Sequence, residues 1–118
     1  MTLQGTTVVV RQLDGGAVGL AITGDLTTSS EGMLLDAYAR ATAVGASLVI
    51  LDFAQVAYMN SGGIGLLVTL LIRARADDRR LMAVGLSAHY RQILGLTRLD
   101  ESIAVFATEA EAIAAAGA

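Results

Sequence analysis

The chain has 118 residues, of which 54% are hydrophobic and 16% charged, with a formal net charge of −3 and no cysteine. This length suits one domain, the apolar fraction excludes intrinsic disorder, and the absence of cysteine excludes disulfides, thiolate metal sites and cysteine nucleophiles. The negative net charge also argues against nucleic-acid binding, which needs a basic surface. With His89 as the single histidine, no histidine cluster for a metal can form within one chain.

The sequence contains no candidate membrane span. Its longest apolar run, Gly62–Ile72, is well short of the roughly 20 residues that cross a bilayer. The first residues lack the positive and apolar regions of a signal peptide. We therefore expect a cytoplasmic protein that does not insert into a membrane.

A β-hairpin is predicted at the beginning of the chain. Val8–Leu13 is rich in β-branched residues, and Val18–Ile22 has apolar residues at alternate positions. Asp14–Gly16, between these two segments, has the composition of a turn. Gly24 and Asp25 close the second strand.

Helices and strands alternate through the rest of the chain. A helix begins near Thr28, where Thr28 and Glu31 fit a capping box, and Gly45 ends it. The later elements are an all-apolar central strand, a second helix, a third internal strand, a short capped helix, a last strand and a terminal helix: Leu48–Leu51, Ser61–Ala76, Arg80–Leu86, Ser87–Leu94, Ile103–Phe106 and a helix from Thr108. The order β-β-α-β-α-β-α-β-α predicts an α/β fold, with right-handed crossovers and helices packed on a mixed sheet.

No catalytic or cofactor motif accompanies this fold. The glycines of Gly62–Gly65 lack the spacing of a dinucleotide-binding loop, and the chain has no lysine for a Walker loop. Ser61 does not lie in a G-x-S-x-G elbow. The aspartates are distant in sequence from His89, so no hydrolase triad is indicated. We expect no catalytic residue, no cofactor and no metal.

The most informative segment is Tyr58-Met59-Asn60-Ser61-Gly62-Gly63-Ile64-Gly65-Leu66-Leu67. It resembles the loop before the second helix in the STAS domains of bacterial anti-sigma factor antagonists, which reads roughly Met-Asp-Ser-Ser-Gly-Leu-Gly. Asn60 takes the aspartate position and Ser61 that of the phosphorylated serine. The following loop positions correspond, in order, to the second serine or threonine, a glycine, a branched residue and a glycine: Gly62, Gly63, Ile64 and Gly65.

The resemblance extends over residues 8 to about 114, in the same element order, and implies a single STAS domain over residues 1–118. Softer matches are Gly24-Asp25-Leu26, Leu51-Asp52, and Leu94-Gly95-Leu96 with Ile103–Phe106. The chain departs from the family pattern at three positions, where the family has an acid, a serine or threonine, and an aspartate: Asn60, Gly62 and Thr27.

The resemblance implies a non-enzymatic module that binds an anti-sigma factor or serine protein kinase and is switched by phosphorylation of Ser61. A phosphoryl group at the start of a helix is favoured by the helix dipole and adds nearly two negative charges. One alternative is that Ser61 only caps the helix. The chain would then be an accessory or scaffold subunit of a transporter or stress-signalling complex. Formation of a homodimer is left open.

Helical periodicity divides the second helix into two faces. We expect one face to pack on the sheet: Gly63, Ile64, Leu67, Leu70, Leu71 and Ala74. The opposite face has small residues that let a partner approach, with Leu66 as an anchor and Arg73 at the rim. The predicted partner-binding residues are Asp25, Thr27, Asn60, Ser61, Gly62, Gly65, Leu66, Thr69 and Arg73.

Overall fold

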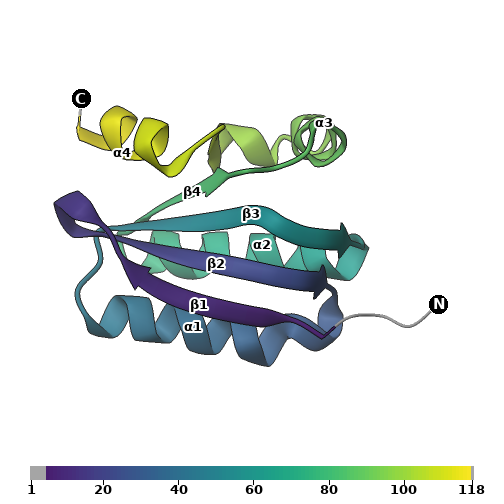
Figure 1. Cartoon of the computed structure of the whole chain (residues 1–118), viewed down its shortest axis with the longest axis horizontal. Coiled ribbons are helices and arrows are strands. Elements are labelled where there is room, and N and C mark those ends of the chain that lie inside the picture. Colours follow the sequence, from purple (N-terminus) through teal and green to yellow (C-terminus); the bar gives the residue numbers. More distant parts are fainter. Residues whose placement is uncertain (1–4, 118) are drawn as a thin grey trace.

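The computed structural model describes residues 5–117 (Figure 1). Its strands are β1 (Thr7–Gln12), β2 (Ala17–Leu26), β3 (Leu48–Met59), β4 (Arg80–Val84) and β5 (Ala104–Phe106). Its helices are α1 (Glu31–Ala43), α2 (Ser61–Ala76), α3 (Ala88–Leu96) and α4 (Glu109–Gly117). Short 3-10 turns connect some of them: η1 (Asp14–Gly16), η2 (Thr28–Ser30) and η3 (Leu99–Glu101). The predicted order of helices and strands is confirmed.

The five strands form one mixed sheet in the order β1-β2-β3-β4-β5. β1 is antiparallel to β2, and each later strand is parallel to the one before it. β3 is the middle strand, as predicted, but it is longer than predicted. It pairs with β4 only up to Asp52, whereas its pairing with β2 continues to Met59. The last part of β3 therefore extends beyond the end of β4.

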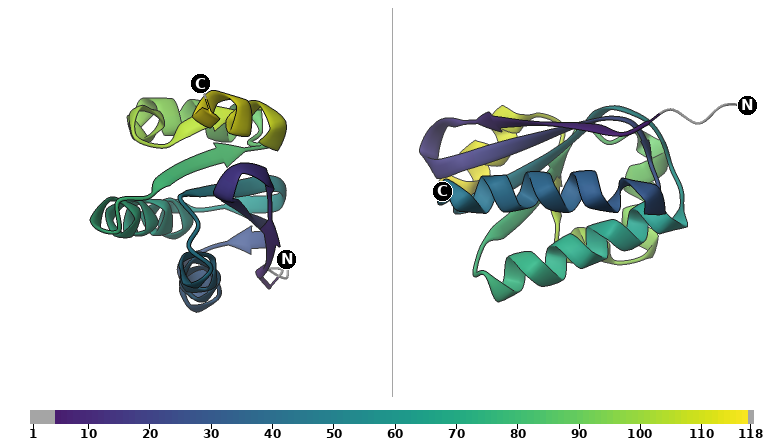
Figure 2. Two further views of the ribbon diagram at one scale, coloured as in Figure 1. Left: turned by 90° about the vertical axis from the view of Figure 1, so that its left-hand side faces the viewer. Right: turned by 90° about the horizontal axis from the view of Figure 1, so that it is seen from below.

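Helices cover both faces of the sheet. α1 and α2 lie on one face, and α3 and α4 lie at the β5 end (Figure 2). Leu51 belongs to the larger core cluster, which includes the buried residues of α1 and α2 and Leu94 of α3. Ile50 belongs to the smaller cluster on the opposite face, which includes Ala112 of α4. All four residues of Leu48–Leu51 are buried, as expected for a strand covered on both sides.

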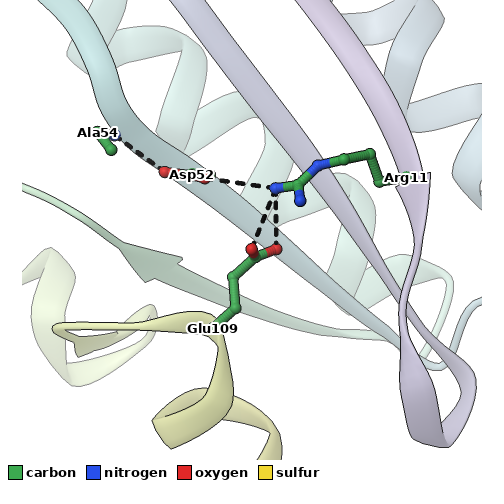
Figure 3. Close-up of polar contacts among 4 residues, drawn as sticks. All are labelled: Arg11, Asp52, Ala54 and Glu109. Atoms are coloured by element: carbon green, nitrogen blue, oxygen red, sulfur yellow. Dashed lines mark hydrogen bonds and ion pairs between the residues drawn. The ribbon is translucent and has the colours of Figure 1, made fainter.

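An arginine on β1 connects the sheet to the first turn of α4 (Figure 3). Nη2 of Arg11 donates to Oε1 and Oε2 of Glu109, both at 3.1 Å, and to Oδ2 of Asp52 at 3.4 Å. The second carboxylate oxygen of Asp52 accepts from the backbone amide of Ala54 at 2.9 Å. Arg11 and Glu109 are 98 positions apart in the chain. The arginine thus joins an N-terminal strand to the C-terminal helix.

Tyr38 connects α1 to the end of α2. Its side chain is only 3% exposed, and its hydroxyl donates to Oδ2 of Asp77 at 2.8 Å. Burial, and then the hydrogen bond to the Asp77 carboxylate, raise the pKa of Tyr38 to about 12. Both effects disfavour the phenolate in the folded chain.

This raised pKa predicts a loss of stability at alkaline pH. An unfolded tyrosine ionises near pH 10. Between about pH 10 and 12 the unfolded chain therefore releases a proton that the folded chain still holds, and the free energy of unfolding falls. The stabilisation is fully present below about pH 10. Urea unfolding of the wild type and of Tyr38→Phe across this window measures the effect. The decline should be shallower in Tyr38→Phe, whereas equal declines would contradict the prediction.

Candidate functional site

The loop between β3 and α2 is fixed by an asparagine cap. Asn60 has extended backbone angles, and its Oδ1 accepts from the backbone amide of Gly63 at 3.0 Å. Ser61 is the first residue of α2 and is exposed. Within residues 5–117 its hydroxyl makes no hydrogen bond. The interpretation of Ser61 as the helix cap is therefore wrong, because Asn60 has that role and leaves the serine hydroxyl available.

Two glycines bring the first turn of α2 close to the end of β2 and to η2. A Cβ atom at Gly63 would lie 2.2 Å from the carbonyl oxygen of Leu26, and one at Gly62 would lie 2.1 Å from Oγ1 of Thr28. Gly62 is thus half-buried against η2, and its predicted place on a flat outer face is corrected. Gly65 differs, since a Cβ atom there meets nothing within 4 Å.

The predicted sheet-facing side of α2 is confirmed, but the predicted outer side is not correct throughout. Leu66, expected to be an exposed anchor, is only 4% exposed and belongs to the larger core cluster. The reason is that α1 and η2 both contact α2, which widens its buried face. Thr69 is half-buried, and its Oγ1 donates to the carbonyl oxygen of Gly65 at 3.2 Å. Arg73 is exposed, as predicted.

The outer surface of α2 is instead formed by residues at helical spacing, which we call the outer ridge: Ser61, Gly65, Val68 and Ile72. The side chains of Val68 and Ile72 are 38% and 64% exposed. No charged residue occurs from Asn60 to Ile72, and Arg73 follows directly. The ridge is therefore an uncharged surface, with the serine at one end and an arginine at the other. Sequence periodicity missed Val68 and Ile72 because it assigned the outer side to their neighbours.

Asp25 lies near the end of β2, and Thr27 lies directly before η2. They are 7% and 9% exposed. The carbonyl oxygen of Asp25 accepts from Oγ1 of Thr6 at 2.6 Å and from Oγ of Ser30 at 3.2 Å, and the amide of Thr27 donates to the same Ser30 oxygen at 3.0 Å. The turn before α1 thus begins at Thr27, one residue before the predicted cap. Both residues are buried in the turn between β2 and α1, which corrects their expected place on an exposed surface.

A tyrosine on α3 supports the loop from the other side. The hydroxyl of Tyr90 accepts from the backbone amide of Met59 at 2.9 Å. Met59 lies beyond Asp52, the last residue of β3 that pairs with β4. The Tyr90 hydroxyl therefore bonds to a part of β3 that does not pair with β4. This contact lies one residue before Asn60. Nothing in the local sequence indicates this contact, which depends on the packing of α3 against the end of β3.

The described residues contain neither a cluster of metal ligands nor a membrane-spanning helix. Between residues 5 and 117, no three histidine or acidic side chains gather where they could hold a metal ion. In the same range, no helix has the length and apolar character needed to span a bilayer. The arrangement around Ser61 presents a hydroxyl and an apolar ridge, which suit protein contact.

Comparison with known proteins supports the fold. Residues 9–107 match a family model described as "Mlab, STAS domain". An anti-sigma factor antagonist from Mycobacterium paratuberculosis superposes with a TM-score of 0.79 at 20% identity, covering 94% of this chain and 93% of that chain. The phosphorylated form of SpoIIAA from Bacillus gives 0.70 at 22% identity, with 93% and 99% covered. The unphosphorylated form of SpoIIAA gives 0.71 at 20% identity, with 93% and 97% covered.

Proposed function

The chain belongs to the STAS domain family, and on that premise we propose that it is a non-enzymatic antagonist of an anti-sigma factor. The observation that carries this proposal is the state of Ser61. Its hydroxyl is exposed at the start of α2 and free of any capping role, because Asn60 caps the helix. A serine in this position is accessible to a kinase and adjoins the outer ridge. The proposed partner is therefore an anti-sigma factor with serine kinase activity.

Phosphorylation at Ser61 would change the loop without disturbing the core. The first amides of a helix lack intrahelical acceptors and favour a negative group nearby. A phosphate there would place about two negative charges beside a surface that has none. In support, SpoIIAA has been solved in both phosphorylated and unphosphorylated forms, and this chain matches the two equally well, with TM-scores of 0.70 and 0.71.

The outer ridge supplies the apolar part of the proposed contact. Val68 and Ile72 take the anchoring role first assigned to Leu66, and Gly65 lets a partner approach the helix backbone. Arg73 lies at the rim, where a charge sets orientation and association rate more than affinity. A partner that buries this ridge would have the Ser61 side chain at the edge of the interface. A phosphate on Ser61 would then lie against an apolar or acidic surface of the partner.

A second candidate function is an accessory or scaffold subunit of a transporter or stress-signalling complex. It is favoured by Asn60 and Gly62, which replace the acid and the second hydroxyl of the antagonist loop. Such a subunit would use the same outer ridge, without modification of Ser61.

Ser61→Asp is expected to weaken partner binding by about tenfold, because it places a charge at the edge of an apolar contact. Ser61→Ala should bind like the wild type. It should also keep the free energy of unfolding within about 0.5 kcal/mol, because the cap is elsewhere. The partner is captured from native lysate and identified by mass spectrometry, and its affinity for each purified variant is measured by calorimetry.

Asn60→Ala is the matched control, since it should lower the free energy of unfolding by about 1 kcal/mol through loss of the cap. This separates destabilisation of the loop from an effect on the switch. A captured kinase that adds a phosphate to the wild type but not to Ser61→Ala supports the antagonist. Equal binding by all Ser61 variants, with no change of mass, leaves the accessory subunit as the function.

A further inference from the structure

The last strand of the sheet has a free edge. β5 pairs with β4 through Ala104, Val105 and Phe106. Within residues 5–117, no strand pairs with its other side. An unpaired edge presents backbone N–H and C=O groups that another extended segment can satisfy. Val105 and Phe106 are half-buried, so the edge is not fully covered by its own chain.

A groove of about 610 Å³ adjoins this edge. Its lining includes Arg91 and Gln92 of α3, Asp100 of η3, Val105 and Phe106 of β5, and Glu111 of α4. α3 packs with the core cluster on the α1 and α2 face, whereas α4 packs on the opposite face. The two helices that follow β4 and β5 thus leave the sheet toward different sides. Crevices at such positions are common ligand sites in α/β folds.

The walls of the groove carry opposite charges with no ion-pair partner of their own. Within residues 5–117, neither Arg91 nor Glu111 takes part in a salt bridge. One oxygen of Glu111 accepts from the amide of Ala107 at 3.2 Å, which fixes the carboxylate next to the end of β5. An occupant therefore meets one guanidinium, from α3, and two carboxylates, that of Asp100 from η3 and that of Glu111 from α4.

We propose that this groove binds an extended peptide segment of a partner protein, which pairs with β5 and extends the sheet. Successive side chains of a strand point to opposite faces. A peptide along β5 would therefore direct one side chain toward α3 and the next toward α4. Charge complementarity selects an acidic residue facing Arg91 and a basic residue facing Glu111. Main-chain pairing gives the affinity in this mode of recognition, and the alternate side chains give the specificity.

The groove is separate from the Ser61 surface. Neither Ser61 nor any other residue of the outer ridge lines it. Tyr90, next to Arg91, points its hydroxyl toward Met59 instead. The peptide proposal therefore does not depend on the proposed function. Ser61→Asp should leave peptide binding unchanged, so each proposal can fail alone.

A random peptide library displayed on phage, selected against the immobilised full chain, tests the proposal. We expect enriched peptides to hold adjacent basic and acidic residues within a β-branched stretch. Binding of the corresponding synthetic peptide should shift the amide resonances of residues 104–107. Proline at a peptide position whose amide pairs with β5 should abolish binding, because it removes a backbone donor.

Glu111→Gln should lower the affinity for the synthetic peptide by about fivefold. The substitution removes the charge but keeps an acceptor for the Ala107 amide. Arg91→Gln should act similarly, whereas Glu101→Gln, a neutralisation outside the groove, should have no effect. The proposal is overturned if no peptide is enriched or if the variants bind equally. It is also overturned if the shifted amides lie in β1, or if the shifts at residues 104–107 follow protein concentration alone, which indicates a second copy of the chain.

Discussion

Gly63→Ala is expected to lower the free energy of unfolding by about 3 kcal/mol. The added Cβ atom would lie 2.2 Å from the carbonyl oxygen of Leu26 and 2.9 Å from the Leu26 carbonyl carbon. These are backbone atoms of β2, so the clash cannot be relieved by rotating a side chain. Either the end of β2 or the first turn of α2 has to move, and the Asn60 cap would be displaced with it. Denaturant unfolding measures the loss.

Gly65→Ala is the matched control in the same helix. Nothing lies within 4 Å of a Cβ atom at Gly65. Glycine is about 1 kcal/mol less favourable than alanine inside a helix, so this change should stabilise the protein by up to that amount. The two substitutions add the same methyl group two positions apart and are expected to have opposite signs. Equal stability of the two variants would show that α2 does not approach β2 as described.

Leu66→Ala is expected to lower the free energy of unfolding by about 3 kcal/mol, because it removes a buried side chain and leaves a cavity. Val68→Ala, two positions later, should change it by less than about 0.5 kcal/mol, because Val68 lies on the outer ridge. The effect on affinity for the proposed partner should be the reverse. Provided that both variants fold, Val68→Ala should bind the partner more weakly than Leu66→Ala. Thermal unfolding and calorimetry on the two proteins separate these effects. A stable Leu66→Ala that fails to bind would restore Leu66 as a surface anchor.

The arrangement of helices and strands could be predicted because it follows from local patterns. The all-apolar run Leu48–Leu51 identified the central strand, since only a strand covered on both faces is apolar at each position. The remainder of β3 was missed because one face of the sheet is no longer covered there. Its sequence from Asp52 to Tyr58 consequently mixes polar and apolar residues without a simple alternation.

The details of the site depend on contacts that no local pattern encodes. Leu66 is buried because α1 and η2 lie beside α2, and a helical wheel contains no information about neighbouring elements. Helical periodicity places Gly62 on a surface for a partner, whereas its small size is required by its close approach to Thr28. The capping role assigned to Ser61 belongs to Asn60, one residue earlier, and either residue type is a good cap. Sequence alone could not decide between them.

The order of the sheet also bears on how the chain acquires its structure during synthesis. Every strand after the first pairs with the strand made just before it, from β1 through β5. A growing polypeptide can therefore lengthen the sheet from one edge, and no earlier strand has to open to admit a later one. The face that α4 covers is the exception, because Glu109 can reach Arg11 only after the 97 residues between them have been made. Until then, the apolar residues Ile50 and Met82 lack their cover, and this is the stage at which a nascent chain most needs protection from aggregation.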